Sequence, residues 1–166
     1  MARKVAIRPT LSNALQADVH IDHAYFLAWD EYALYLAANM DDVHLTYPQP
    51  NSGWQADHFT IQLTPVEQRE TGRDSHTTIV IYPTGGGAEQ QPYAAVVTRP
   101  QQLQPLPLSI ARQSRSNGYA IEVRIPATAL PGFQPAPDTS WHLTIEYQNV
   151  AGIYQTRWEG IVTLVP

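Results

Sequence analysis

The stretch YAIEVRIP at residues 119–126 decides the fold class. Its large apolar side chains alternate with polar or small ones, and a period of two residues is typical of a β-strand with one buried face. The same pattern recurs as FTIQLTP at residues 59–65 and as WHLTIEYQ at residues 141–148. Three such segments predict antiparallel sheets that turn one face toward a core and the other toward water.

Shorter apolar runs on either side of these segments add further strands. Residues 24–29 and 33–38 are joined by Asp30 and Glu31, which indicates a hairpin with a two-residue link. Asn117-Gly118 is the strongest tight-turn dipeptide of the chain. Further strands are expected at four apolar runs, residues 77–82, 93–98, 106–112 and 160–165. Long polar loops, where binding residues usually lie on a β scaffold, are expected at residues 41–56, 65–76 and 99–105.

Helix is predicted at one place only. Residues 127–130 lie between Pro126 and Pro131 and suit one short helical turn, because proline is favoured at the first helical position. About ten strands with this single turn predict an all-β protein, an antiparallel β-sandwich. The 166 residues fit one domain, residues 1–166, in which residues 1–15 form a less regular amino-terminal arm.

Composition argues against several classes of protein. Ten basic and fifteen acidic residues give a net charge of −5, so a basic nucleic-acid surface is not expected. No apolar stretch is long enough for a membrane span, and no apolar run of a signal peptide follows residues 1–5. The chain has no cysteine and no Gly-X-Ser-X-Gly elbow, so we expect neither disulfides nor an enzyme with a cysteine or serine nucleophile.

Aromatic residues in predicted loops are the first candidates for a binding site. Trp54 lies in a polar loop just before a strand, and Tyr154 lies in a predicted turn with Trp158 nearby. Exposed rings can stack on the apolar face of a sugar while polar neighbours bond to its hydroxyls. Loop aromatics also commonly fold back onto the edge of a sandwich, so the residues by themselves leave both interpretations open.

Acidic and polar residues supply further candidates. Asp41, Asp42 and Asp57 could give oxygen ligands to a calcium ion, although loop aspartates are more often turn formers. Polar rows are also expected on two strands. They comprise Glu122 and Arg124 on one strand and His142, Thr144 and Glu146 on another. Such rows form either a solvated outer face with cross-strand ion pairs or the floor of a concave binding face.

The sequence resembles family 9 carbohydrate-binding modules over roughly residues 20–162. LAWDEYALYLAANMDD at 27–42 is similar to the family's W-D-x-x-x-L-Y run that ends in an aspartate, and GWQADHFTIQLTP at 53–65 to its Trp-x-x-Asp and following strand. NGYAIEVRIPATAL at 117–130 carries the most specific match, Gly-Tyr-x-x-Glu-x-x-Ile-Pro-x-x-x-Leu. This resemblance implies a non-catalytic β-sandwich related to DOMON domains, with a carbohydrate ligand and with bound calcium.

The resemblance also implies roles for particular residues. Trp54 and Tyr154 would form an aromatic clamp, with Asn149, Gln148 and Thr60 as polar partners. The sequence departs from the family in three ways. A threonine stands at position 60 where sugar-binding members have a glutamate, the usual second tryptophan is missing from its place, and the amino-terminal Asp-Gly…Trp signature is absent.

Two other functions stay open beside sugar binding. Some domains of this kind serve as structural or partner-docking units, attached to a catalytic domain or to a partner protein. The resemblance also implies a secreted or periplasmic location. Some DOMON domains hold haem through a methionine and a histidine or lysine. Met40 is the only internal methionine here, and His44 or His142 would be its partner.

Overall fold

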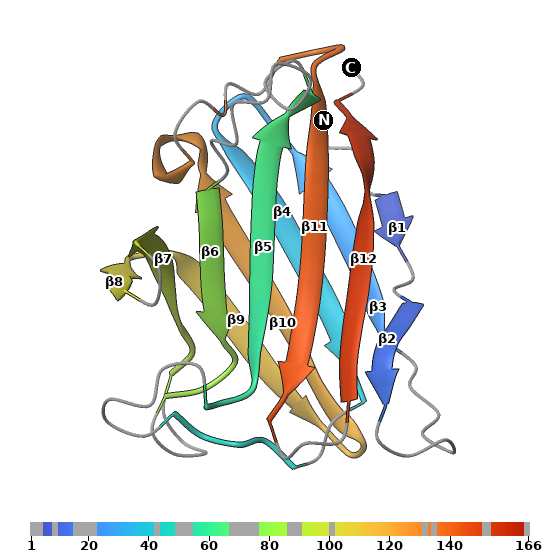
Figure 1. Cartoon of the computed structure of the whole chain (residues 1–166), viewed down its shortest axis with the longest axis vertical. Helices are drawn as coiled ribbons and strands as arrows, with labels where there is room; N and C mark the ends of the chain where they lie inside the picture. The colour runs from blue at the N-terminus through green and yellow to red at the C-terminus, as the bar shows by residue number, and fades with distance from the viewer. Residues whose placement is uncertain are drawn as a thin grey trace.

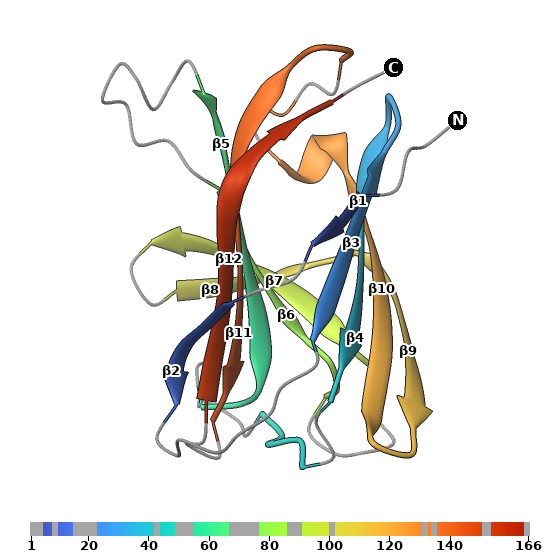
Figure 2. The ribbon, with the colours of Figure 1, turned by 90° about the vertical axis from the view of Figure 1, so that its right-hand side faces the viewer.

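The protein is described by a computed structural model that covers residues 5–7, 10–14, 23–41, 44–48, 55–66, 77–85, 91–99, 102–130, 133, 136–150 and 154–164. These ranges contain twelve β-strands in two antiparallel sheets and one 3-10 turn. Figures 1 and 2 show the two sheets packed face to face. The prediction of an all-β antiparallel sandwich is therefore confirmed. No helix in these ranges is long and apolar enough to cross a membrane.

One sheet has five strands in the order β1–β3–β4–β10–β9. They are β1 (Val5–Ile7), β3 (Ala24–Trp29), β4 (Ala33–Met40), β10 (Gly118–Pro126) and β9 (Ser109–Arg115). The alternation in β10 has the predicted effect, because Ile121 and Val123 are buried while Glu122 and Arg124 on the opposite face are exposed.

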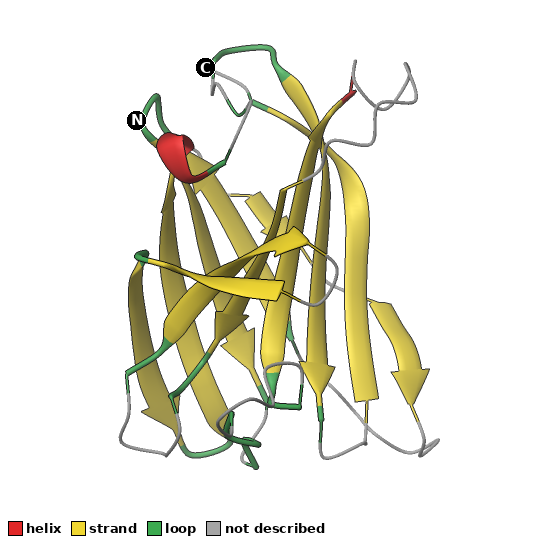
Figure 3. Ribbon diagram, turned by 60° about the vertical axis from the view of Figure 1, so that its left-hand side comes forward, coloured by secondary structure: helices red, strands yellow, loops and turns green. Residues whose placement is uncertain are grey.

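The other sheet has seven strands in the order β2–β12–β11–β5–β6–β7–β8. They are β2 (Thr10–Ala14), β12 (Tyr154–Thr163), β11 (Ser140–Asn149), β5 (His58–Pro65), β6 (Thr77–Tyr82), β7 (Tyr93–Arg99) and β8 (Gln102–Leu106). In Figure 3 the β7–β8 hairpin runs obliquely to the long strands. A small second core lies at this edge of the sheet, where Ala56, Val80 and Tyr82 pack with Val97 and Leu103.

The main core fills the space between the sheets. It is built from the inward-facing side chains of both sheets, among them Tyr25, Leu36 and Ile121 from the five-stranded sheet and Ile145 and Tyr147 from the seven-stranded sheet. Complete burial of one large apolar side chain contributes about 1.5–3 kcal/mol, so these rows dominate the stability of the fold.

The turns lie where the sequence predicted them. The Asp30 carboxylate accepts hydrogen bonds from the backbone N–H groups of Tyr32 (2.8 Å) and Ala33 (2.9 Å), so the β3–β4 link is Asp30–Tyr32, one residue longer than predicted. Gly118 follows the β9–β10 turn with a φ of 155°, which an L side chain rarely adopts. The predicted helical turn is present as the 3-10 turn η1 (Ala127–Ala129).

Two loop predictions were wrong. Residues 99–105 were expected to be a loop, but β8 begins at Gln102 because an edge strand tolerates Pro105, whose missing N–H removes no bond on the open side. The predicted strand 106–112 is divided after β8, and the chain then crosses to the other sheet as β9. Likewise, Tyr154 is not in a turn but is the first residue of β12, paired with Asn149.

The amino-terminal segment adds more structure than an arm would. The short strand β1 pairs with β3 in one sheet, and β2 pairs with β12 in the other. These two strands, together with the division of the predicted strand 106–112, account for the difference between the twelve observed and the smaller number expected.

Candidate functional site

Several predicted site residues meet at one end of the seven-stranded sheet, the lower end in Figure 1. There β11 ends at Asn149, β12 begins at Tyr154 and β5 begins at His58. Asn149 is paired with Tyr154, and Gln148 is paired with both Gln155 and His58. The fold therefore brings together residues that the sequence separates widely.

The outer face at this end carries two rows of side chains. Tyr147 and Phe59 point into the core, so their neighbours Gln148 and His58 point outward. We call the outermost set the end row; it contains Gln155, Gln148, His58, Tyr82 and Tyr93. The set next to it is the second row, which contains Arg157, Glu146, Thr60, Val80 and Ala95.

The end row is aromatic on its β6–β7 side. The fully buried Tyr82 ring stacks on Tyr93, with ring centroids 4.6 Å apart and an angle of 15° between the planes. Tyr93 remains 40% exposed, so it offers an aromatic surface that a buried ring supports. Burial raises the pKa of both phenols, and both therefore stay neutral at physiological pH.

His58 continues this aromatic cluster toward the amides of the end row. Its ring lies 5.9 Å from the Tyr82 ring, and its Nδ1 lies 2.7 Å from the carbonyl oxygen of Ala56. Burial lowers the pKa of His58, so the imidazole is neutral at pH 7 and Nδ1 carries the proton that it donates to this carbonyl. The ring is thereby fixed in one orientation.

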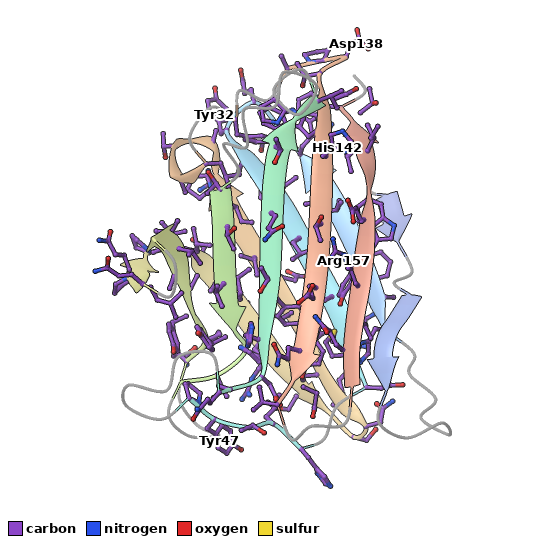
Figure 4. All side chains as sticks on the ribbon, in the orientation of Figure 1. Tyr32, Tyr47, Asp138, His142 and Arg157 are labelled. Atoms are coloured by element: carbon purple, nitrogen blue, oxygen red, sulfur yellow. The ribbon has the colours of Figure 1, made fainter. Side chains whose placement is uncertain are left out.

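The second row contains a carboxylate close to position 60, where this chain has a threonine in place of the glutamate of sugar-binding family members. Glu146 lies directly opposite Thr60 on the same face of the sheet, and its carboxylate is 3.7 Å from the Arg157 guanidinium. Arg157, labelled in Figure 4, also binds Glu159 at 2.8 Å. This is the cross-strand ion pair expected of a polar outer face. Glu146 therefore places a carboxylate one strand away from position 60.

A buried aspartate anchors the chain beside this end of the sheet. Asp57 is 1% exposed and accepts hydrogen bonds from the backbone N–H groups of Val150 (2.6 Å) and Thr46 (2.8 Å). The backbone N–H of Asp57 also donates to the Thr46 carbonyl at 3.0 Å. Tyr47 follows Thr46 and lies at the same lower end in Figure 4. Asp57 therefore holds residues 44–48 against the end of β11.

The remaining predicted aromatics are placed as follows. Trp54 lies outside the described residues, and of Tyr154 only the backbone is described. Trp158 is opposite the buried Ile145, packs against the main core, and its ring lies over Gly160. It therefore faces inward, away from the face that carries Gln148 and Thr60.

The predicted calcium ligands that the structure describes already accept hydrogen bonds from other groups of the chain. Asp57 uses both oxygens as acceptors for backbone N–H groups, and Asp41 accepts a bond from the Asn117 amide at 2.7 Å. Asp42 lies outside the described residues. In the described part of the chain, no three histidine or acidic side chains gather where a metal ion could be held. Calcium binding stays a prediction that these contacts do not support.

Met40 and His142, one of the two predicted pairs of haem ligands, do not face one another. Met40 is buried in the main core, whereas His142 lies on the outer face of the seven-stranded sheet, near the upper end in Figure 4. His44 is exposed in the segment that Asp57 anchors. The core packing of Met40 already accounts for a buried methionine at this position.

Sequence reasoning missed His58, Tyr82 and Tyr93. Tyr82 and Tyr93 were assigned to strands and His58 stood just before one, but their gathering depends on the pairing of β5, β6 and β7, which no local pattern reveals. The β6–β7 connection with its Gly85-Gly86-Gly87 run was the one signal that Tyr82 and Tyr93 stand at facing strand ends.

Comparison with known proteins identifies the family. The chain belongs to the carbohydrate family 9 binding domain-like family, which it matches over residues 2–157. None of the curated proteins compared with it gives a match.

Solved structures resemble the whole chain. One is a family 9 carbohydrate-binding module from Caldicellulosiruptor kristjanssonii in complex with cellotriose, with a TM-score of 0.59, 13% identity and coverage of 96% of this chain and 83% of that one. The module from the same organism in complex with glucose has a TM-score of 0.61 and 13% identity, with 95% and 83% coverage. At this identity the likeness shows the fold alone.

Proposed function

We propose that this domain binds a carbohydrate without catalysis, on the outer face of the seven-stranded sheet at the end row and second row. The observation that carries the proposal is one sheet face that holds the amides of Gln148 and Gln155 beside a carboxylate–guanidinium pair, with the exposed Tyr93 at the far end of the same row, three strands from Gln148. Membership of a carbohydrate-binding family supports it. So do the two structural neighbours, which were solved with cellotriose and glucose.

The chemistry of the face suits a sugar. A pyranose ring has apolar C–H faces that stack on aromatic rings and an edge of hydroxyls that both donate and accept hydrogen bonds. Tyr93 would supply the ring, Gln148 and Gln155 the amides, and Glu146 with Arg157 a charged acceptor and donor. Charge-assisted hydrogen bonds are the stronger kind, so the second row would fix the orientation of the sugar.

The aromatic clamp remains part of the proposal. Trp54 precedes the anchored Asp57 by three residues, and Tyr154 begins β12 beside Gln148 and Asn149. We expect their rings to flank the end of the sheet, where a sugar bound at the end row would extend past β11 and β12. Calcium at Asp41, Asp42 and Asp57 is a separate proposal, tested by repeating each binding measurement in EDTA.

The test is calorimetric titration with cellotriose and glucose, the sugars of the structural neighbours. Gln148 is exposed, so Gln148→Ala removes an amide from the site without disturbing the core. We expect it to weaken binding about tenfold, the loss of one good hydrogen bond. His142→Ala changes the same outer face at the other end of β11 and should leave the affinity unchanged. Equal affinities for the wild type and Gln148→Ala would exclude this face.

A further inference from the structure

The outer face of the five-stranded sheet carries a groove that the proposed site does not use. Its volume is about 590 Å³, within the range of small-molecule pockets. The groove crosses β3, β4, β10 and β9, whereas the end row lies on the other sheet. Glu122 and Arg124, the polar pair that the sequence singled out on β10, form part of its lining.

The strand register explains why this face is hollow. One line across the sheet runs Phe26, Ala37, Glu122, Ala111, and the next runs Ala28, Tyr35, Arg124, Ser109. Each line therefore contains two small and two large side chains, and the small ones lie on all three of the strands β3, β4 and β9. The alanines and the serine leave a floor, and the two aromatic rings and the two charged side chains rise around it.

Tyr35 is held in place at the rim. Its hydroxyl donates a hydrogen bond to the Asp30 carboxylate at 2.7 Å, and the same carboxylate accepts bonds from Tyr32 and Ala33 in the turn. The bond from Tyr35 is the main cause of the lowered pKa of Asp30, which Arg124 lowers further. Asp30 is therefore ionised at neutral pH, and the ring needs no reordering to meet a ligand.

We propose that this groove is a second saccharide-binding site, for a short neutral oligosaccharide. The rings of Phe26 and Tyr35 give apolar surfaces for a pyranose, while Glu122 and Arg124 give an acceptor and a donor for its hydroxyls. One negative and one positive charge face the groove from β10, and the ionised Asp30 at the rim accepts hydrogen bonds from Tyr32, Ala33 and Tyr35, so no excess of positive charge would select an anionic ligand. Exposed charges at the centre also disfavour a protein partner, since interface centres are depleted of glutamate.

The second site would make the domain bivalent. The two sites lie on opposite sheets of the sandwich, so one domain would engage two chains of a polysaccharide, and its retention on a dense glycan surface would exceed either single-site affinity. This consequence adds to the proposed function, but the groove can bind sugar whether or not the end row does.

The experiment follows the two sites separately by NMR. Cellotriose, xylotriose and mannotriose are titrated in turn into the wild-type protein, while the methyl signals of Ala37 and Ala111 report on the groove and the side-chain amide of Gln148 reports on the end row. We expect at least one of these sugars to move both methyl signals with a saturable dependence on sugar concentration.

Matched variants locate the effect. Ala111→Trp fills the floor from an exposed edge strand, and Gln113→Trp places the same ring on the same face of β9, two residues along and outside the lining. We expect Ala111→Trp to weaken groove binding at least tenfold and Gln113→Trp to change it less than twofold. Glu122→Gln, a small change at an exposed position, should weaken groove binding severalfold with the fold intact.

Three outcomes would overturn the inference. In the first, all three sugars leave the Ala37 and Ala111 signals unmoved, and a shift of Gln148 in that titration would uphold the proposed function alone. In the second, the Ala37 methyl signal moves with sugar equally in the wild type and in Ala111→Trp, which lacks the Ala111 reporter. In the third, they move with protein concentration in the absence of sugar, which would mark the groove as a contact between copies of the chain.

Discussion

The Asp57 carboxylate accepts a hydrogen bond from the backbone N–H of Val150 at 2.6 Å, although the two residues are 93 apart in sequence. Its second oxygen accepts a bond from Thr46 at 2.8 Å. One buried charge thus joins the start of β5, the end of β11 and the segment 44–48. Bonds to an ionised acceptor are roughly twice as strong as neutral ones, so this aspartate fixes the end of the sandwich where the proposed site lies.

Replacement of Asp57 tests this anchoring. Asp57→Ala leaves two partly buried N–H groups without their acceptor, and we expect the free energy of unfolding in urea to fall by about 2–4 kcal/mol. Asp57→Asn keeps one acceptor oxygen and should lose about half as much. Asp41→Asn, at a more exposed aspartate, serves as the control and should cost less than about 0.5 kcal/mol. If the loss in Asp57→Ala disappeared when EDTA was present, the carboxylate would act through calcium and not through these two bonds.

The buried His58 predicts a fall in stability on acidification. Its folded-state pKa is lowered below the ordinary 6.5, chiefly by burial. As the pH falls, the unfolded chain therefore binds a proton at His58 before the folded chain does. The contribution of the neutral His58 to the free energy of unfolding is complete above about pH 6.5 and is lost as the pH falls. Between pH 7 and 5 the wild type should lose more stability than His58→Gln, by at most about 1.4 kcal/mol per pH unit. Parallel curves of unfolding free energy against pH for the two proteins would contradict this.

We predict that position 160 must be glycine, because the ring of Trp158 occupies the space that a side chain would need. A Cβ added at Gly160 would lie 2.7 Å from Cζ2 and 2.9 Å from Cη2 of that indole. Gly160→Ala must therefore displace Trp158 from its place against the core, which we expect to cost about 1–3 kcal/mol. In a Trp158→Leu background the same substitution should cost less than about 0.5 kcal/mol. Thermal or urea unfolding of the four proteins completes the cycle, and an equal cost in both backgrounds would show that Trp158 does not set the limit.

One hydrogen bond joins the two sheets inside the core. The Tyr25 hydroxyl lies 3.2 Å from the Thr156 hydroxyl, and Tyr25 is completely buried. We expect Tyr25→Phe and Thr156→Val each to destabilise the protein by about 1 kcal/mol. The double variant should lose less than the sum, because the first change already removes the shared bond. Strict additivity in urea unfolding would mean that the two hydroxyls do not interact.

The sequence predicted which side chains are buried better than it predicted which strands pair. Alternation along 119–126 and 141–148 correctly separated buried from outward side chains, because the period of a strand is a property of the local chain. It could not show that these two strands lie in different sheets, so the predicted polar rows of Glu122 and of Glu146 proved to be on opposite faces of the sandwich. Pairing between strands depends on long-range packing, which leaves no local signature.

The site was predictable only in part for the same reason. Gln148, Asn149 and Tyr154 were expected to meet, and their backbones do lie side by side in β11 and β12. The stacking of Tyr82 on Tyr93 depends on the register of β6 and β7, and the position of Glu146 opposite Thr60 on the register of β11 and β5. The inward orientation of Trp158 follows from its place opposite Ile145. The sequence did not predict this pairing, because the last strand was expected to begin only at residue 160.

A glycan array shows whether the domain binds carbohydrate and whether Trp54 is needed for it, when wild-type protein and Trp54→Ala are applied at equal concentration after their equal stability in urea has been established. We expect the wild type to be retained by at least one class of glycan and Trp54→Ala to lose this retention. A wild type that is retained by no glycan, or two proteins retained equally, would contradict it.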